Sequence, residues 1–113
     1  MGTSCVDIYT HRVKSGREAD FQKLWHKIAN YFVSNDSAKA ATLLHRTDNN
    51  TYISIGRWPT KKDADEGWST ESKAWKEIPP EILKAIQEMK ACVDQTKKEP
   101  RVLADAVDSI FKD

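Results

Sequence analysis

The sequence predicts a single α+β domain built on an antiparallel sheet. Its 113 residues are close to the commonest domain size and are enough for a two-layer core. Strand-like and helical segments alternate in the order β-α-β-β-α-(α)-β. A strand that crosses by a helix to a hairpin, and then by a helix to a last strand, is typical of the ferredoxin-like arrangement, with the helices on one face of the sheet.

The first strand is expected from Cys5 to Val13. Side chains alternate between the faces of a strand, so Val6 and Ile8 should lie on one face, and Tyr9, His11 and Val13 on the other. The next three residues, Lys14-Ser15-Gly16, interrupt this pattern.

The helix that follows has the clearest amphipathic pattern of the chain. Ser15 and Glu18 have the spacing of a capping box, so the helix should begin near Gly16 or Arg17. Its apolar residues recur at helical spacing and predict one buried face. They are Phe21, Leu24, Trp25, Ile28, Tyr31 and Phe32.

A β-hairpin is expected next. Lys39 to Arg46 is the second strand, and Asp48-Asn49-Asn50 is the turn, because Asn and Asp tolerate the left-handed conformation that hairpin turns use. The third strand, Tyr52 to Trp58, is rich in β-branched and aromatic residues and ends at Pro59.

A second helix should follow, with Thr60 as its N-cap. Ala64, Trp68 and Trp75 are spaced by four and seven residues, which predicts that they share one face of this helix.

The C-terminal third is expected to add an extra helix and a closing strand. Pro79-Pro80 breaks the preceding helix, and Pro80 suits the first turn of a new one within residues 79–98. Residues 99–113 form a closing strand or a tail. The segment from Val102 to Phe111 fits a strand or a short helix, and its place in the fold favours the strand.

Composition excludes several functional classes. With 18 basic and 17 acidic residues the net charge is +1, so a nucleic-acid partner, which requires a basic stripe, is not expected. No apolar run approaches the roughly 20 residues of a membrane span, and no secretory signal is visible, so a cytoplasmic protein is expected. Cys5 and Cys92 have no metal or redox spacing and are interpreted as reduced packing residues.

From the first strand to Trp68 the chain resembles the antibiotic biosynthesis monooxygenase-like domain of the dimeric α/β barrel superfamily. The features that carry this resemblance are the helix entry at Lys14-Ser15-Gly16, the Asp48-Asn49-Asn50 hairpin, and Trp58 followed ten residues later by Trp68. It covers roughly residues 5–78. It implies a homodimer whose two sheets face each other, with a pocket in each subunit between the sheet and the helices.

The resemblance implies a small oxygenase that acts on an aromatic, phenolic or quinol-type substrate without a bound cofactor. One alternative is a non-catalytic dimeric module that binds a small hydrophobic ligand or a partner protein. A third is haem binding or degradation. The haem-degrading members carry an axial histidine where this chain has Ile78, and no histidine follows His45.

Six residues are candidates for the site. Tyr9, His11 and His45 are expected to handle protons, since imidazoles with a pKa near neutrality can accept a phenolic proton. In the haem-degrading members that the chain resembles, a polar side chain at the position of Tyr9 faces the ligand. His11 and His45 would be neighbours if the first two strands lie close together. Two histidines could then bind a metal ion with Asp7 as the third ligand, but no metal site is predicted.

The expected pocket walls are Trp58, Trp68 and Trp75, although tryptophans in a small domain also serve simply to fill its core.

Overall fold

Four strands form one antiparallel sheet in the order β2-β3-β1-β4. The computed structural model describes residues 5–35, 41–48, 50–67, 72–97 and 99–105. The predicted α+β, ferredoxin-like arrangement is confirmed. The strands are β1 (Cys5–Arg12), β2 (Ala41–Arg46), β3 (Thr51–Trp58) and β4 (Val102–Asp105).

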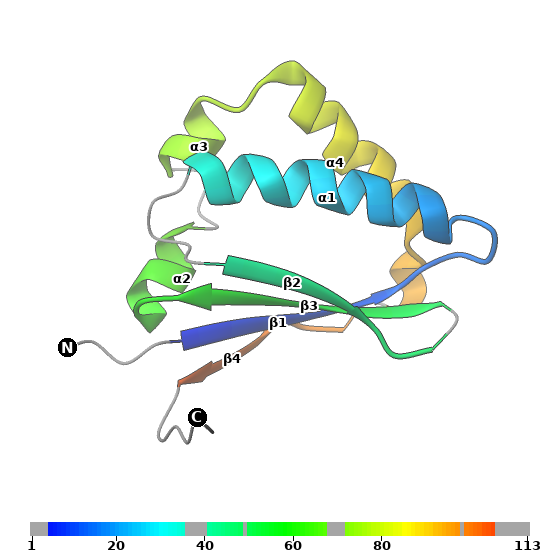
Figure 1. Cartoon of the computed structure of the whole chain (residues 1–113), viewed down its shortest axis with the longest axis horizontal. Helices are drawn as coiled ribbons and strands as arrows, with labels where there is room; N and C mark the ends of the chain where they lie inside the picture. Colours follow the sequence, from blue (N-terminus) through cyan, green and yellow to red (C-terminus); the bar gives the residue numbers. More distant parts are fainter. Residues whose placement is uncertain (1–4, 36–40, 49, 68–71, 98, 106–113) are drawn as a thin grey trace, which may run out of the picture.

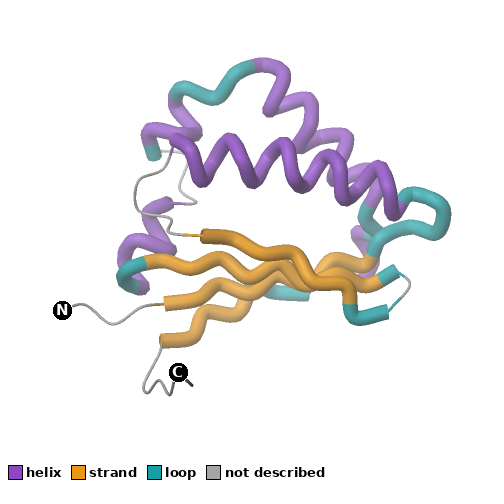
Figure 2. The backbone as a smooth tube through the Cα atoms, in the orientation of Figure 1, coloured by secondary structure: helices purple, strands orange, loops and turns teal. Residues whose placement is uncertain are grey.

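The helices form a second layer over one face of this sheet. Figure 1 shows α1 and α4 side by side above the strands, and the same two layers are seen in Figure 2. Among the described helices, none is both long enough and apolar enough to cross a membrane. The helices are α1 (Glu18–Asn35), α2 (Lys61–Gly67), α3 (Lys73–Lys76), α4 (Pro80–Cys92) and the 3₁₀ helix η1 (Gln95–Lys97).

The entry into α1 is a tight turn that depends on glycine. The N–H of Arg17 donates to the carbonyl of Lys14 at 3.0 Å, and Gly16 has φ +87°, the left-handed value that the third position of a type II turn requires. Glu18 Oε1 accepts from the N–H of Gly16 at 3.2 Å and from Asn50 Nδ2 at 2.7 Å. In the expected capping box, Glu18 would accept from the N–H of Ser15, whereas it accepts from the N–H of the next residue, Gly16. Its bond with Asn50 also links the turn to the β2–β3 loop.

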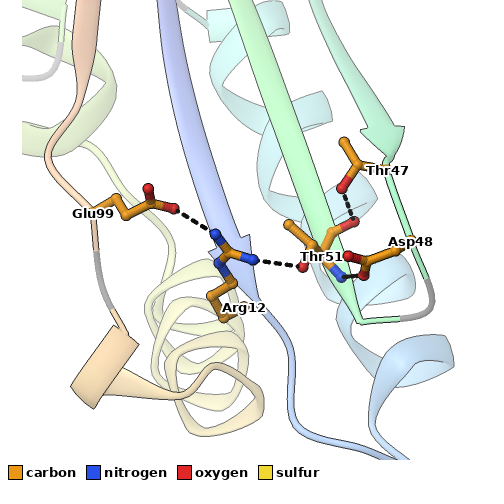
Figure 3. Close-up of polar contacts among 5 residues, drawn as sticks. All are labelled: Arg12, Thr47, Asp48, Thr51 and Glu99. Atoms are coloured by element: carbon orange, nitrogen blue, oxygen red, sulfur yellow. Dashed lines mark hydrogen bonds and ion pairs between the residues drawn. The ribbon is translucent and has the colours of Figure 1, made fainter.

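The hairpin loop is closed by a carboxylate. Asp48 Oδ1 accepts from the backbone N–H of Asn50 at 3.0 Å. It also accepts from the backbone N–H of Thr51 at 2.9 Å (Figure 3). These N–H groups lower the pKa of Asp48. The predicted hairpin is confirmed, although no described non-glycine residue has a positive φ.

Arg12, at the end of β1, joins three segments of the chain. Its guanidinium donates to Thr51 Oγ1 at 3.1 Å and to Glu99 Oε2 at 3.2 Å (Figure 3). It therefore links the hairpin on one side of β1 to the segment that leads into β4 on the other.

The second helical segment is broken, and the single helix expected there is wrong. Thr60 does cap α2, with Oγ1 accepting from the N–H of Asp63 at 3.1 Å, but α2 ends at Gly67. Ser72 has an extended backbone and starts α3 afresh, because its Oγ accepts from the N–H of Trp75 at 3.4 Å. A serine side chain that bonds the backbone in this way favours a helix start over a helix interior.

The C-terminal third follows the prediction. Pro80 lies in the first turn of α4, with Pro79 at the N-cap. The last segment forms a strand over Val102–Asp105, as expected. This strand pairs with β1, and Val102 lies opposite Ile8. Residues 106–113 lie outside the described residues.

Trp58 is the largest side chain of the core under α2. It is 1% exposed and packs with Cys5 and Ala64, and its Nε1–H donates to Asp7 Oδ2 at 3.0 Å. Cys5 and Cys92 are both buried as thiols, Cys5 in this cluster and Cys92 in the cluster that contains Phe21 and Tyr52, as expected for packing residues. The indole therefore fills the core and also supplies a donor to a buried carboxyl group.

Replacing Trp58 by Phe should lower the free energy of unfolding by about 2 kcal/mol, because a buried hydrogen bond and packing volume are both lost. Urea titration followed by circular dichroism measures this. Trp25→Phe, at a partly exposed position, is the control and should cost less than about 1 kcal/mol. Equal losses in the two variants would contradict the assigned role of the Trp58–Asp7 bond.

Candidate functional site

A pocket of about 280 Å³ lies between the sheet and the helices. One side of it is apolar and is supplied by α1, α3 and α4, and polar groups come mainly from the strands. This division is typical of small-molecule sites, in which a few polar groups orient a ligand against apolar walls. The apolar lining includes Trp25, Ile28, Phe32, Trp75, Ile86 and Met89, and the polar lining is Asp7, Tyr9, His11, Thr42, Ser54 and Lys90.

The polar side chains share the pocket because of strand alternation. Asp7, Tyr9 and His11 are alternate residues of β1 and point toward the helices. Ser54 of β3 lies directly opposite Tyr9 of β1, and its Oγ lies 2.9 Å from His11 Nε2. The β1–β3 register therefore fixes the pocket floor, by which we mean Asp7, Tyr9, His11 and Ser54.

His11 is held as a neutral imidazole. Burial lowers its pKa to about 4, because the charged form is poorly solvated between the sheet and α1. Its ring lies 5.3 Å from that of Phe21. At pH 7 His11 is therefore free to accept a proton, but it is a weak base.

Tyr9 is held in its protonated form. Burial raises the pKa of its hydroxyl, an effect that its hydrogen bond with Arg101 partly offsets and that the nearby Asp7 reinforces. Arg101 also pairs with Asp65 of α2 at 3.2 Å. The Tyr9 hydroxyl can therefore donate a hydrogen bond at neutral pH, and it does not serve as a base there.

His45 lies on the other face of the sheet. Strand β3 separates β1 from β2, and the register pairs His45 with Ile53, which pairs in turn with Thr10. The expected contact between His45 and His11 is therefore wrong, since it assumed that the first two strands adjoin. The possible metal set with Asp7 is not assembled either, and the described residues contain no cluster of three metal-ligating side chains.

The three candidate tryptophans have different positions. Trp75 lines the pocket with its ring 5.4 Å from that of Phe32. Its Nε1–H is buried and has no hydrogen-bond partner among the described residues. Trp58 lies in the core outside the pocket lining, and Trp68 lies outside the described residues.

Sequence reasoning did not place several of the lining residues in the pocket, among them Trp25, Ser54 and Lys90. Trp25 was expected only as a member of the apolar face of α1. It lies on that helix and also lines the pocket. The alternation of β3 could have placed Ser54 beside His11. No pattern in the sequence indicated that Lys90 lines the pocket, because its position depends on how α4 packs against α1.

The residues do not fit a haem group. Ile78, at the position of the expected axial ligand, packs into the apolar cluster that contains Ile28 and Ala85. Among the described lining residues the only histidine is His11, and its Nε2 is engaged by Ser54.

The fold is that of proteins named as antibiotic biosynthesis monooxygenases. SnoaB of Streptomyces nogalater, a cofactor-independent oxygenase, is 15% identical with a TM-score of 0.69, over 97% of this chain and 99% of its own. Proteins so named from Caulobacter crescentus and Nitrosomonas europaea both have TM-scores of 0.67, at 16% and 15% identity. The matches cover 95% of this chain in both cases, and 92% and 93% of theirs.

No family model and no curated protein matches the sequence. At the identities of the structural matches, the similarity confirms the expected fold.

The burial of His11 should make the protein less stable in mild acid. Above pH 6.5 the imidazole is neutral in both states, whereas between pH 6.5 and about 4 only the unfolded chain takes up the proton. The free energy of unfolding should therefore fall by about 3 kcal/mol over this window. Urea titrations from pH 7.5 to 4 should show the loss in the wild type and a smaller one in His11→Gln. Equal slopes in the wild type and His11→Gln would refute the burial effect.

Proposed function

We propose that this protein is a small oxygenase that acts on an aromatic, phenolic or quinol-type substrate without a bound cofactor. The observation that carries the proposal is the pocket between sheet and helices, which combines aromatic walls with the neutral His11–Ser54 pair. The shared fold with a cofactor-independent oxygenase supports it.

In the proposed reaction the substrate itself supplies the electrons. A phenolic or enolic proton is removed, and the resulting anion is electron-rich enough to reduce O₂. When a ring CH₂ is oxidised to a carbonyl, one oxygen atom enters the product, and the other leaves as water with the two hydrogens of that carbon. O₂ is the only oxidant, so atoms and electrons balance without a cofactor.

The pocket residues have distinct roles in this proposal. His11, neutral at pH 7, accepts the substrate proton, and Ser54 orients its ring. The Tyr9 hydroxyl donates to a substrate oxygen. The buried Nε1–H of Trp75 would gain a partner from a substrate carbonyl, which removes the cost of an unsatisfied donor. His45, on the opposite face, has no role in this pocket.

A second candidate is a non-catalytic module that binds a small hydrophobic ligand. The low basicity of His11 favours this alternative, because a pocket with a weak base and aromatic walls can bind a ligand without reacting with it. Turnover and binding measured on the same variants distinguish the two functions.

Replacing His11 by Gln should lower oxygen consumption with a quinol or anthrone substrate by about 100-fold, as expected when a proton acceptor is removed. The affinity for the same compound should change less than about threefold. An oxygen electrode measures turnover, and quenching of tryptophan fluorescence measures binding.

His26→Gln is the matched control for this experiment and should retain full activity. Binding without oxygen uptake in the wild type across a panel of quinols, phenols and anthrones would favour the binding module. Loss of turnover in His45→Ala but not in His11→Gln would refute the assignment of the pocket.

We also propose that two copies pair through the sheet face that carries no described α-helix. Ile55, Ile8 and Val102 lie directly opposite one another across β3, β1 and β4 and form an apolar row on that face. Val102 is 53% exposed in the single chain. Covering this row with a second copy would remove apolar surface from water.

Ile8→Lys should convert the proposed dimer into a monomer, because it places a charge in the centre of the apolar row. Size-exclusion chromatography with light scattering gives the mass, and circular dichroism verifies folding. Leu83→Lys, at an exposed position of α4 on the helical side, should remain dimeric. A monomeric wild-type protein would overturn this part of the proposal.

A further inference from the structure

Lys90 is the only lysine or arginine among the described residues that line the pocket. It belongs to the last turns of α4, on the helical side of the site. No ion pair within the described part of the chain involves it, whereas Lys84, six residues earlier, lies 4.0 Å from Glu88. Lys90 is itself exposed, and within the described part of the chain it is the cationic residue of the pocket lining and has no ion-pair partner.

The chain path places Lys90 at the same end of the pocket as His11. The segment after α4 is fastened to the end of β1, since Asp94 N–H donates to the Arg12 carbonyl and Lys14 N–H donates to the Cys92 carbonyl, both at 2.8 Å. A bridge between Val13 and Val93 lies beside them. The last turns of α4 are therefore held over the end of β1 that carries His11.

The remaining ionisable groups of the pocket do not compete for this role. His11 and Tyr9 stay uncharged at neutral pH, because burial disfavours the charged form of each. Asp7 lies four residues before His11 on β1, toward the end of the strand that packs against the core cluster of Trp58 and Ala64. An anion in the pocket would thus find its cation at the Lys90 end.

We propose that Lys90 binds the substrate as an aromatic oxyanion, with the planar ring against the aromatic walls and the negatively charged phenolic oxygen between Lys90 and His11. This inference rests on the proposed function for its choice of a phenolic ligand. It adds that the pocket binds the phenolate form of the ligand in preference to the neutral phenol, and that Lys90 is responsible for this preference.

The energetics of proton removal show why such a cation matters. An ordinary phenol has a pKa of about 10, so transfer of its proton to an imidazole of pKa about 4 is uphill by about 8 kcal/mol. An opposite charge close to the phenolate lowers the pKa of the phenol by about 1–3 units. Lys90 therefore supplies part of the stabilisation that the weak base His11 does not.

A chromogenic phenol tests this without any turnover. 4-Nitrophenol absorbs strongly only as the phenolate, so a pH titration with excess protein reads the pKa of the bound phenol. In the wild type this pKa should lie about one unit below that of the free compound. Lys90→Met should abolish the shift and weaken phenolate binding about tenfold. The binding of nitrobenzene, a neutral analogue, should not change.

Two further variants make the result specific. Lys84→Met, on the same helix but outside the pocket lining, should keep the full shift, and Lys90→Arg should restore most of it. An unshifted pKa in the wild type, or the same shift in Lys90→Met, would overturn the role of Lys90. The outcome is separable from the oxygenase proposal. A shift that depends on Lys90 without oxygen uptake supports only the anion site, and oxygen uptake that depends on His11 without the shift supports only the oxygenase.

Discussion

The central position of β1 is the constraint on which the rest of the structure depends. It pairs with β3 on one side and β4 on the other, so both of its edges are bonded and its register cannot slip without moving two neighbours. Alternation then turns every second side chain of β1 toward the helices, where Cys5 packs in the core and Asp7, Tyr9 and His11 line the pocket. One strand therefore sets both the packing of the core and the chemistry of the site.

Burial favours the uncharged form of two of the ionisable groups that β1 contributes to the pocket, Tyr9 and His11. It lowers the pKa of His11 and raises that of Tyr9, and in each case the uncharged form is the one retained. Tyr9 and His11 therefore offer hydrogen bonds without charge, and Asp7 is the remaining ionisable side chain that β1 contributes to the lining. Charge enters from the helical layer instead, through Lys90.

The sequence was informative wherever structure is decided locally. The apolar stripe of α1, the Asp48 hairpin and the Pro80 helix start were all predictable, because periodicity and turn chemistry involve near neighbours. The neighbours of His11 were not predictable from its own strand, since strand order and a one-residue register decide which face a residue occupies. Lys90 was out of reach because its place follows from the packing of α4 on α1, which no local pattern encodes.

The pairing of β1 with β4 also has a consequence for how the chain folds. It joins the first described strand to the last, so this edge of the sheet cannot close until nearly all of the intervening chain has been made. During synthesis β1 can pair with β3, but its other edge stays open, next to the apolar row that contains Ile8. Contacts so distant in sequence form slowly, and unpaired strand edges attract other chains. The nascent protein is therefore most prone to aggregation in the interval before β4 arrives.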